Sequence, residues 1–341
     1  MRVGIATFYA FTGFWKLNDH FTDPAYSCAV EAVERFGEQI YRFPTGPLVQ
    51  SGAIWTTLTL EVLGPAILLF ASVRRVGLLG FVLFHAVLSL DYAQGFLNFS
   101  GVMFALLVFF LDPKAIRRGL EPLDPLILAG PWAATWTLAA VASVVAGTML
   151  PDFAQQDVPE LIRWRVFVFI YLPFTLSFFL SALREVPEPR SVLQASSRSM
   201  AWLVAALVLS NGLSPWLGVK DRNSWQMYSN LRLEPGASNH WLVPRSMDLL
   251  DLQSDTVKVH FVSDRYLYNA WTKKGVEVRW YMLRWHAWRN PDLTIGYLRD
   301  GNSHEAETVA DDPLLTPPPW PVRKVSWFRP SGEAVAGQCQ W

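Results

Sequence analysis

The sequence predicts an all-α polytopic membrane protein, a helix bundle of about seven spans, followed by a small C-terminal β-rich domain outside the membrane. Two observations predict this fold class. Of the 341 residues, 51% are hydrophobic and only 17% are charged, against roughly 25% charged in soluble proteins. The charge is also uneven: about 13% of residues 1–219 are charged, compared with about 24% of residues 220–341. We therefore expect a transmembrane domain over 1–219 and a soluble β-rich domain over 220–341.

The composition also excludes several classes of protein. The formal net charge is zero and near zero in each part, so we expect no nucleic-acid partner. Two cysteines cannot form a disulfide scaffold, and no spacing of Cys and His indicates a metal site. Cys28 and Cys339 fall on the same predicted side of the membrane, but nothing else pairs them, so we expect no disulfide. The chain contains no nucleotide-binding glycine loop, no G-x-S-x-G and no H-E-x-x-H.

The first predicted span covers residues 3–23, which begin as an apolar run and turn polar at Lys16. A signal peptide is a poor interpretation, because Arg2 alone would form its basic region and no cleavage site follows. At 1.5 Å per residue, 3–23 would reach about 30 Å, the thickness of a bilayer core. A polar connector over 24–47 follows, and its segment Cys28–Phe36 has the pattern of an amphipathic helix.

Six further apolar segments are separated by polar or proline-containing loops. They cover residues 48–72, 76–93, 96–111, 126–150, 166–183 and 199–218. If the N-terminus lies inside, the predicted inner loops hold nine Lys and Arg residues and the outer loops hold six. The positive-inside rule then places the C-terminal domain outside. We expect an integral protein of a bacterial inner membrane, with membrane lipid as a partner.

In the C-terminal domain the pattern of apolar residues predicts strands. Thr256–Ser263 alternates apolar and polar side chains, and Leu293–Arg299 runs into an Asp-Gly turn at 300–301. Val325–Phe328 is predicted to be a last short strand. Gly275–Trp288 fits a strand or an amphipathic helix equally well.

Three ionisable side chains lie inside predicted spans: Lys16, Glu61 and His85. Placing such a group inside a membrane span costs roughly 2.5–3.5 kcal/mol of free energy on insertion scales. The presence of each of the three therefore needs an explanation. If the spans alternate in direction, all three lie within about 8–10 Å of the midplane and could form one polar pocket. The alternatives are that Lys16 extends to the membrane surface, that Glu61 pairs within the bundle, and that His85 is a hydrogen-bonded core residue.

Two clusters of polar side chains lie outside these spans. The first continues from His85 to Asn98 and Ser100, and contains no Lys or Arg. It is either a solvated turn or the lip of a substrate cavity, to which Asn98 would contribute. The second, Met227–His240, fits a membrane-proximal loop that satisfies its own backbone.

Four segments of the sequence together resemble the HTTM (horizontally transferred transmembrane) family, which is related to vitamin K-dependent gamma-glutamyl carboxylase. They are FYAFTGFWKLN at 8–18, LEVLGP at 60–65, FH at 84–85 and GFLNFSGVMF at 95–104. The stretch MYSNLRLEPGASNH at 227–240 is similar to a segment of bacterial members of this family.

The resemblance implies a site and a chemistry. Lys16 would be the base that deprotonates a reduced naphthoquinone, similar to vitamin K hydroquinone. The oxygenated quinone would become an alkoxide that removes a glutamate γ-proton, CO2 would capture the resulting carbanion, and the quinone epoxide would be the co-product. A lysine can act as a base only when its surroundings favour the neutral amine. His85 would hydrogen-bond a quinone oxygen, while Glu61, Asn98 and the aromatic ring of Trp15 would bind the substrate. No metal is implied.

Two classes of function stay open at this point. The first is quinone-linked epoxidase or carboxylase chemistry, and the second is a non-enzymatic membrane protein that binds lipid or a partner chain. A transporter would need inverted repeats, which the sequence lacks. Family members carry further spans before the K-L-N helix. We therefore expect a shortened member, a fragment that lacks its N-terminal segment, or one half of a split protein that needs a partner chain.

Overall fold

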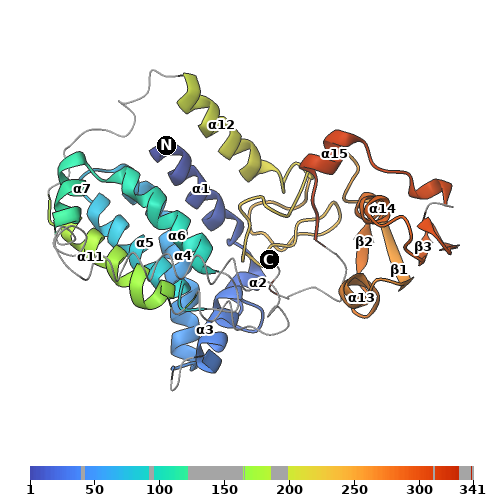
Figure 1. Cartoon of the computed structure of the whole chain (residues 1–341), viewed down its shortest axis with the longest axis horizontal. Helices are drawn as coiled ribbons and strands as arrows, with labels where there is room; N and C mark the ends of the chain where they lie inside the picture. The colour runs from blue at the N-terminus through green and yellow to red at the C-terminus, as the bar shows by residue number, and fades with distance from the viewer. Residues whose placement is uncertain are drawn as a thin grey trace. The chain divides into compact units, whose positions relative to one another are not determined.

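The computed structural model describes residues 1–39, 43–91, 96–121, 164, 166–185, 199–309, 312–329 and 339. These residues form twelve α-helices and one four-stranded sheet (Figure 1). Among them only α4 (Pro47–Leu69), with 23 residues, is long and apolar enough to cross a membrane. The prediction of a bundle of about seven spans is therefore wrong. The predicted span over 126–150 lies outside the described residues.

The other apolar helices of the described ranges are too short for the spans that hydropathy predicted. Their bounds are α1 (Arg2–Trp15), α5 (Arg74–Leu88), α6 (Phe96–Leu107) with the 3-10 turn η1 (Val108–Phe110), the π-helical η3 (Phe167–Tyr171) with α11 (Leu172–Ala182), and α12 (Ser199–Leu213). A helix of 14 or 15 residues rises only about 21–23 Å. Hydropathy overestimated the lengths because an apolar run continues past the residue at which the backbone leaves the helix.

The first predicted span, 3–23, is in fact two helices. α1 ends at Trp15, and α2 (Asp19–Thr22) begins after Asn18. The Oδ1 atom of Asn18 accepts a hydrogen bond of 2.9 Å from the backbone N–H of Phe21, the bond of an N-cap residue. The polar residues at 16–18 therefore mark a break between helices and not the polar end of one span.

The chain forms two compact units, and each is built from separated segments. Unit 1 comprises Met1–Ala10, Ala32–Val49 and Trp55–Ala205, and unit 2 comprises Phe11–Glu31, Gln50–Ile54 and Ala206–Trp341.

Unit 1 is a helical assembly in its described part. α5 packs against α6 and α11, and α11 also packs against α7 (Pro113–Leu120) (Figure 1). Leucine and phenylalanine side chains dominate its core, including Leu68, Leu78, Phe81, Phe104, Leu107, Phe110 and Phe179. The helix α3 (Cys28–Gln39) confirms the amphipathic helix predicted from Cys28.

One face of α4 is buried and the other is exposed. The buried positions recur every three or four residues, at Ile54, Leu58, Glu61, Pro65 and Leu68, which is the spacing of one helix face. The exposed face is largely apolar: Trp55, Val62, Leu63 and Phe70. The helix therefore buries its one charged residue and exposes apolar side chains.

Unit 2 contains the sheet, whose strand order is β2-β1-β3-β4 with every pair antiparallel. The strands are β1 (Thr256–Val262), β2 (Glu277–Arg279), β3 (Ile295–Arg299) and β4 (Asn302–Ala306). The predicted strands over Thr256–Ser263 and Leu293–Arg299 are confirmed. Their inward residues pack against α14 (Trp280–Arg289) in one hydrophobic core.

The predicted hairpin turn between β3 and β4 is also confirmed. Val259 pairs with Tyr297 in the centre of the sheet, and Arg299 pairs with Asn302 across the turn. Asp300 and Gly301 have φ angles of +50° and +80°, which a two-residue type I′ turn requires. An Asp-Gly dipeptide meets that requirement.

Two other C-terminal segments depart from a simple strand pattern. Gly275–Trp288, for which strand and helix were left open, contains both, because β2 leads directly into α14. The predicted strand at Val325–Phe328 is wrong, since Val325 ends α15 (Trp320–Val325) and no strand follows it in the described residues. Four residues of apolar and polar alternation are too few to separate a strand from the end of a helix.

Cys28 and Cys339 form a disulfide, so the expectation of unpaired cysteines is wrong. Their Cα atoms are 5.1 Å apart, within the range that a disulfide needs. A pairing across 311 residues of sequence leaves no local signal, because it depends on the tertiary fold alone.

Candidate functional site

Trp15, at the C-terminal end of α1, belongs to unit 2 and is a packing residue there. Its indole is buried, and its Nε1–H donates a hydrogen bond of 2.9 Å to the backbone carbonyl of Gly212 in α12. A side chain at Gly212 would collide with the ring of Phe11. The glycine therefore permits this close approach of α1 and α12. Trp15 was predicted to bind substrate, but its ring is fully enclosed by the protein.

Lys16 follows directly and is only 4% exposed. Its Nζ donates hydrogen bonds of 3.4 Å to the backbone carbonyls of Thr12 and Met227. The ring of Phe21 lies 5.8 Å from the same atom. Carbonyl oxygens and an aromatic face both stabilise a cation. The predicted base thus joins α1 to the segment around Met227.

Asn18 makes four side-chain hydrogen bonds in this region. Its Nδ2 donates to the carbonyls of Trp15 (2.8 Å) and Ser229 (2.7 Å), and its Oδ1 accepts from Asn239 (3.2 Å) in addition to its cap bond. The side chain is fully buried. The two sequence motifs, the K-L-N end of α1 and Met227–His240, therefore form one hydrogen-bond network in unit 2.

Asn230 and His240 complete that network. Asn230 accepts a bond of 2.7 Å from the backbone N–H of Cys28 and donates one to the carbonyl of Tyr26. Nδ1 of His240 accepts from two backbone N–H groups, at 3.0 and 3.1 Å, so its other ring nitrogen carries the proton and donates to the carbonyl of Phe14 at 2.9 Å. Burial lowers the pKa of His240 below its usual value. The ring is therefore a neutral connector.

His85 lies in unit 1 and is fully buried in α5. Its Nε2 is 2.6 Å from the hydroxyl oxygen of Tyr9. Its Nδ1 has no hydrogen-bond partner among the described residues. A histidine with one bonded and one unbonded nitrogen can donate to or accept from a ligand at the second atom.

Aromatic rings surround this histidine. Phe84, Phe99 and Phe104 have ring centroids within 5.3–6.2 Å of its imidazole, and Phe81 packs on Tyr9 with centroids 4.0 Å apart. The site is therefore a polar pair inside an aromatic enclosure.

Glu61 belongs to the same unit, and the charge of its carboxylate acts on the hydroxyl of Tyr9. Tyr9 is thus hydrogen-bonded to His85 and lies within electrostatic range of Glu61. The sequence did not single out Tyr9, because a tyrosine in an aromatic run carries no charge signal. Its position one helix turn after Ile5, on the face of α1 that enters the core of unit 1, could have indicated a buried hydroxyl.

The predicted lip of the cavity has a structural role in its described part. Asp91 is buried and forms an ion pair of 2.8 Å with Arg35 and a hydrogen bond of 3.0 Å with Gln39. The hydroxyl of Ser89 donates to the carbonyl of Ala86. Asn98 is exposed on α6. Gln94, part of the same hairpin, lies outside the described residues.

The predicted site residues therefore fall into two groups. Lys16 and Trp15 belong to unit 2, whereas His85, Glu61 and Asn98 belong to unit 1. No group of three or more His, Cys, Asp and Glu side chains in the described ranges could hold a metal ion.

Comparison of the chain with known protein families, with curated proteins and with solved structures finds no match. Function must accordingly be argued from the geometry of the chain's own residues.

Proposed function

We propose that the chain is an integral membrane protein that binds a quinone-type lipid beside His85. One observation carries this proposal, namely the buried Nδ1 atom of His85 that has no partner within the described residues. A buried polar atom without a hydrogen bond costs about 1–3 kcal/mol. A ligand oxygen at this atom would recover that cost. The resemblance of the sequence to the HTTM family points to the same class of ligand.

The faces of α4 support a position in the membrane. Glu61 is 6% exposed, whereas Trp55 and Leu63 are 58% and 55% exposed. In water a helix turns its charged residues outward and its apolar residues inward, and a helix in lipid does the reverse. α5 follows the same rule, since His85 is buried and Val76 is exposed. A surface of this kind is stable against lipid chains.

The residues around His85 fit a flat ring that carries oxygen atoms. If the hydroxyl of Tyr9 donates to Nε2, then Nδ1 carries the proton and can donate to a ring oxygen. Phe84 and Phe99 are partly exposed, so a flat ligand can reach His85 by displacing these two rings. A bound reduced naphthoquinone would supply the electrons that reduce O2 as the quinone epoxide forms.

Catalysis with Lys16 as the base is the second candidate, and the burial of this lysine favours it. The carbonyls of Thr12 and Met227 oppose it, because they stabilise the ammonium form. A quinone-binding protein without catalytic activity requires only the His85 site. A binding measurement and a turnover measurement separate the two.

The binding test uses the full chain in a neutral detergent, titrated with a soluble naphthoquinone and followed by calorimetry. We expect wild-type protein to bind, and His85→Ala to bind at least tenfold more weakly, because one buried hydrogen bond is lost. Tyr9→Phe keeps the ring and removes the hydroxyl, so we expect a smaller loss. His260→Ala, at a half-exposed histidine of unit 2, is the matched control and should leave binding unchanged. Equal affinity of His85→Ala and wild type would refute the site.

The turnover test measures epoxide formed from the reduced naphthoquinone in membranes. If Lys16 is the base, Lys16→Arg abolishes turnover while expression stays near normal, since arginine practically cannot lose its proton. Full activity of Lys16→Arg would end the base assignment. Binding at His85 without epoxide from the wild type would leave a non-enzymatic quinone-binding protein.

A further inference from the structure

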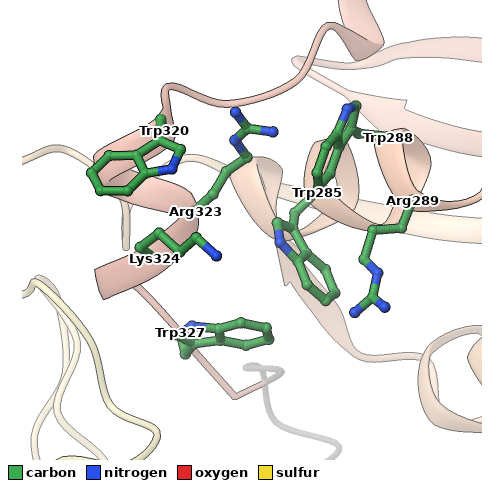
Figure 2. A pocket seen from close by; sticks show the side chains of 7 residues that line it. All are labelled: Trp285, Trp288, Arg289, Trp320, Arg323, Lys324 and Trp327. Atoms are coloured by element: carbon green, nitrogen blue, oxygen red, sulfur yellow. The ribbon is translucent and has the colours of Figure 1, made fainter.

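A second site lies in unit 2, between α14 and α15. It is a pocket of about 680 Å3, and Figure 2 shows that side chains of the two helices face each other across it. Aromatic side chains make up much of its wall. They are Trp285, Trp288, Trp320 and Trp327.

The remaining residues that line the pocket are all basic: Arg289, Arg323 and Lys324. No acidic residue is among the side chains that line it. The chain as a whole has no net charge, so three cations on one pocket are a local concentration of positive charge. Such a pocket attracts an anion.

The arginines occupy the faces of two indoles. The guanidinium carbon of Arg323 lies 4.4 Å from the ring centre of Trp288, and that of Arg289 lies 5.0 Å from the ring centre of Trp285. A guanidinium stacked on a ring is held in one plane and keeps its edge N–H groups available. Arginines held in this way are suited to a phosphate, which accepts two parallel hydrogen bonds.

Two of the indoles remain open to the outside. Trp320 is 64% exposed and Trp288 is 50% exposed. A third, Trp327, meets Trp285 edge to face, with ring centroids 4.7 Å apart. Exposed indoles beside Arg and Lys are the side chains that lie at the headgroup level of a bilayer.

We propose that this pocket binds the headgroup of an anionic phospholipid, with the phosphate at Arg289, Arg323 and Lys324. The exposed ring of Trp320 would lie among the glycerol and upper acyl groups. This site is separate from the quinone site of unit 1 and does not depend on it.

A single-stranded nucleic acid is the main competing ligand, because it also combines phosphate with stacking rings. Base stacking needs free aromatic faces. Arg323 covers one face of Trp288, and Arg289 covers one face of Trp285. Trp285 and Trp327 are also tilted by 71° to each other, so they do not form a parallel platform. The geometry therefore favours the lipid.

The test uses the full chain in a neutral detergent, with bound lipid counted by native mass spectrometry. Short-chain phosphatidylglycerol is titrated against the matched phosphatidylcholine. We expect the anionic lipid to bind at least tenfold more tightly. The double variant Arg289→Gln/Lys324→Gln changes two exposed positions. It should weaken the binding of phosphatidylglycerol by about fivefold per charge, or about 25-fold in total. Trp320→Ala should weaken the binding of both lipids.

Lys273→Gln/Lys274→Gln removes two exposed charges elsewhere in unit 2 and is the matched control, which should bind like wild type. Glycerol 3-phosphate and an oligothymidylate are titrated in parallel. Equal binding of both lipids, or an equal loss in the control variant, would overturn the proposal. Tighter binding of glycerol 3-phosphate than of the lipid would make this a site for a soluble phosphate, and preference for the oligonucleotide would make it a nucleic-acid site. Either result would also overturn it.

Discussion

Asn18 shows how one side chain can hold several parts of the chain at once. It caps α2, bonds to the end of α1 through Trp15, and bonds to Ser229 more than two hundred residues away. All of these bonds are buried, so each lost partner would leave a polar group without water.

We therefore predict that Asn18→Ala lowers the free energy of unfolding by about 3 kcal/mol, the sum of a lost cap and an unpaired buried carbonyl. Chemical unfolding of the full chain, followed by tryptophan fluorescence, measures this loss. Asn290→Ala, at an exposed asparagine that bonds only to its own helix, is the control and should cost less than 1 kcal/mol. Equal losses in both variants would show that the network around Asn18 is dispensable.

Asp221 makes the stability of the fold depend on pH. Its Oδ1 accepts a hydrogen bond of 2.7 Å from the backbone N–H of Arg329. Burial raises the pKa of Asp221 from 3.8 to about 6, although Arg329 and Arg279 act in the opposite direction. The folded state therefore holds this proton more tightly than the unfolded state does.

The contribution of Asp221 to stability should accordingly grow as the pH falls from 7 to 5 and be lost as the pH rises through about 6. The expected change is about 1 kcal/mol in the free energy of unfolding. Unfolding curves at pH 5, 6 and 7 measure it, and Asp221→Asn should flatten the difference. Asp292→Asn, at an exposed aspartate of the same unit, should keep the wild-type dependence. An unchanged profile in Asp221→Asn would assign the effect to another group.

At the scale of elements, the sequence predicted where helices and strands begin better than where they end. The strand at Thr256 and the helix at Cys28 begin at the predicted residues. The change to polar residues at Lys16 was interpreted as the polar end of one span, whereas α1 stops at Trp15 and Asn18 caps a new helix and bonds to the distant Ser229.

The candidate sites were predictable to different degrees for a similar reason. Glu61 and His85 were found because a polar residue in an apolar helix is conspicuous in a sequence. Tyr9 was missed because its hydroxyl matters only through His85. The tryptophan and arginine pocket was missed because its residues come from two helices whose packing the sequence does not reveal.

The turn between β3 and β4 offers a test of backbone conformation alone. Gly301 has φ of +80°, whereas the φ of Gly236 lies outside the positive region, and a Cβ at either position would meet no atom within 4 Å. We predict that Gly301→Ala costs about 1 kcal/mol, since a side chain at positive φ is strained. Gly236→Ala should be neutral or slightly stabilising, because it reduces the freedom of the unfolded chain. Thermal unfolding of the two variants compares them directly, and equal shifts would exclude a strained turn.

At the scale of the whole molecule, the disulfide between Cys28 and Cys339 joins distant parts of unit 2. Disulfides persist in oxidising compartments, which favours the predicted location of the C-terminal domain outside the cytoplasm.

We predict that the purified chain runs faster on a non-reducing gel than on a reducing one, because the crosslink closes a loop of nearly the whole chain. Reduction should lower the free energy of unfolding by about 2–5 kcal/mol. Without reductant, Cys28→Ser should already have the gel mobility and the stability of the reduced wild-type protein. Identical mobility of wild type and Cys28→Ser would mean that the bond does not form.

Unit 2 also constrains the order in which the protein can be made. Its first segment, Phe11–Glu31, shares the unit with Ala206–Trp341, which includes the carbonyl of Met227 that accepts the bond from Lys16. At about 5–20 residues per second of synthesis, the early segment leaves the ribosome about 10–40 seconds before those partners exist. During that interval the end of α1 lacks the partners that Gly212 and Met227 later provide. A chain that terminates before Met227 therefore cannot assemble unit 2.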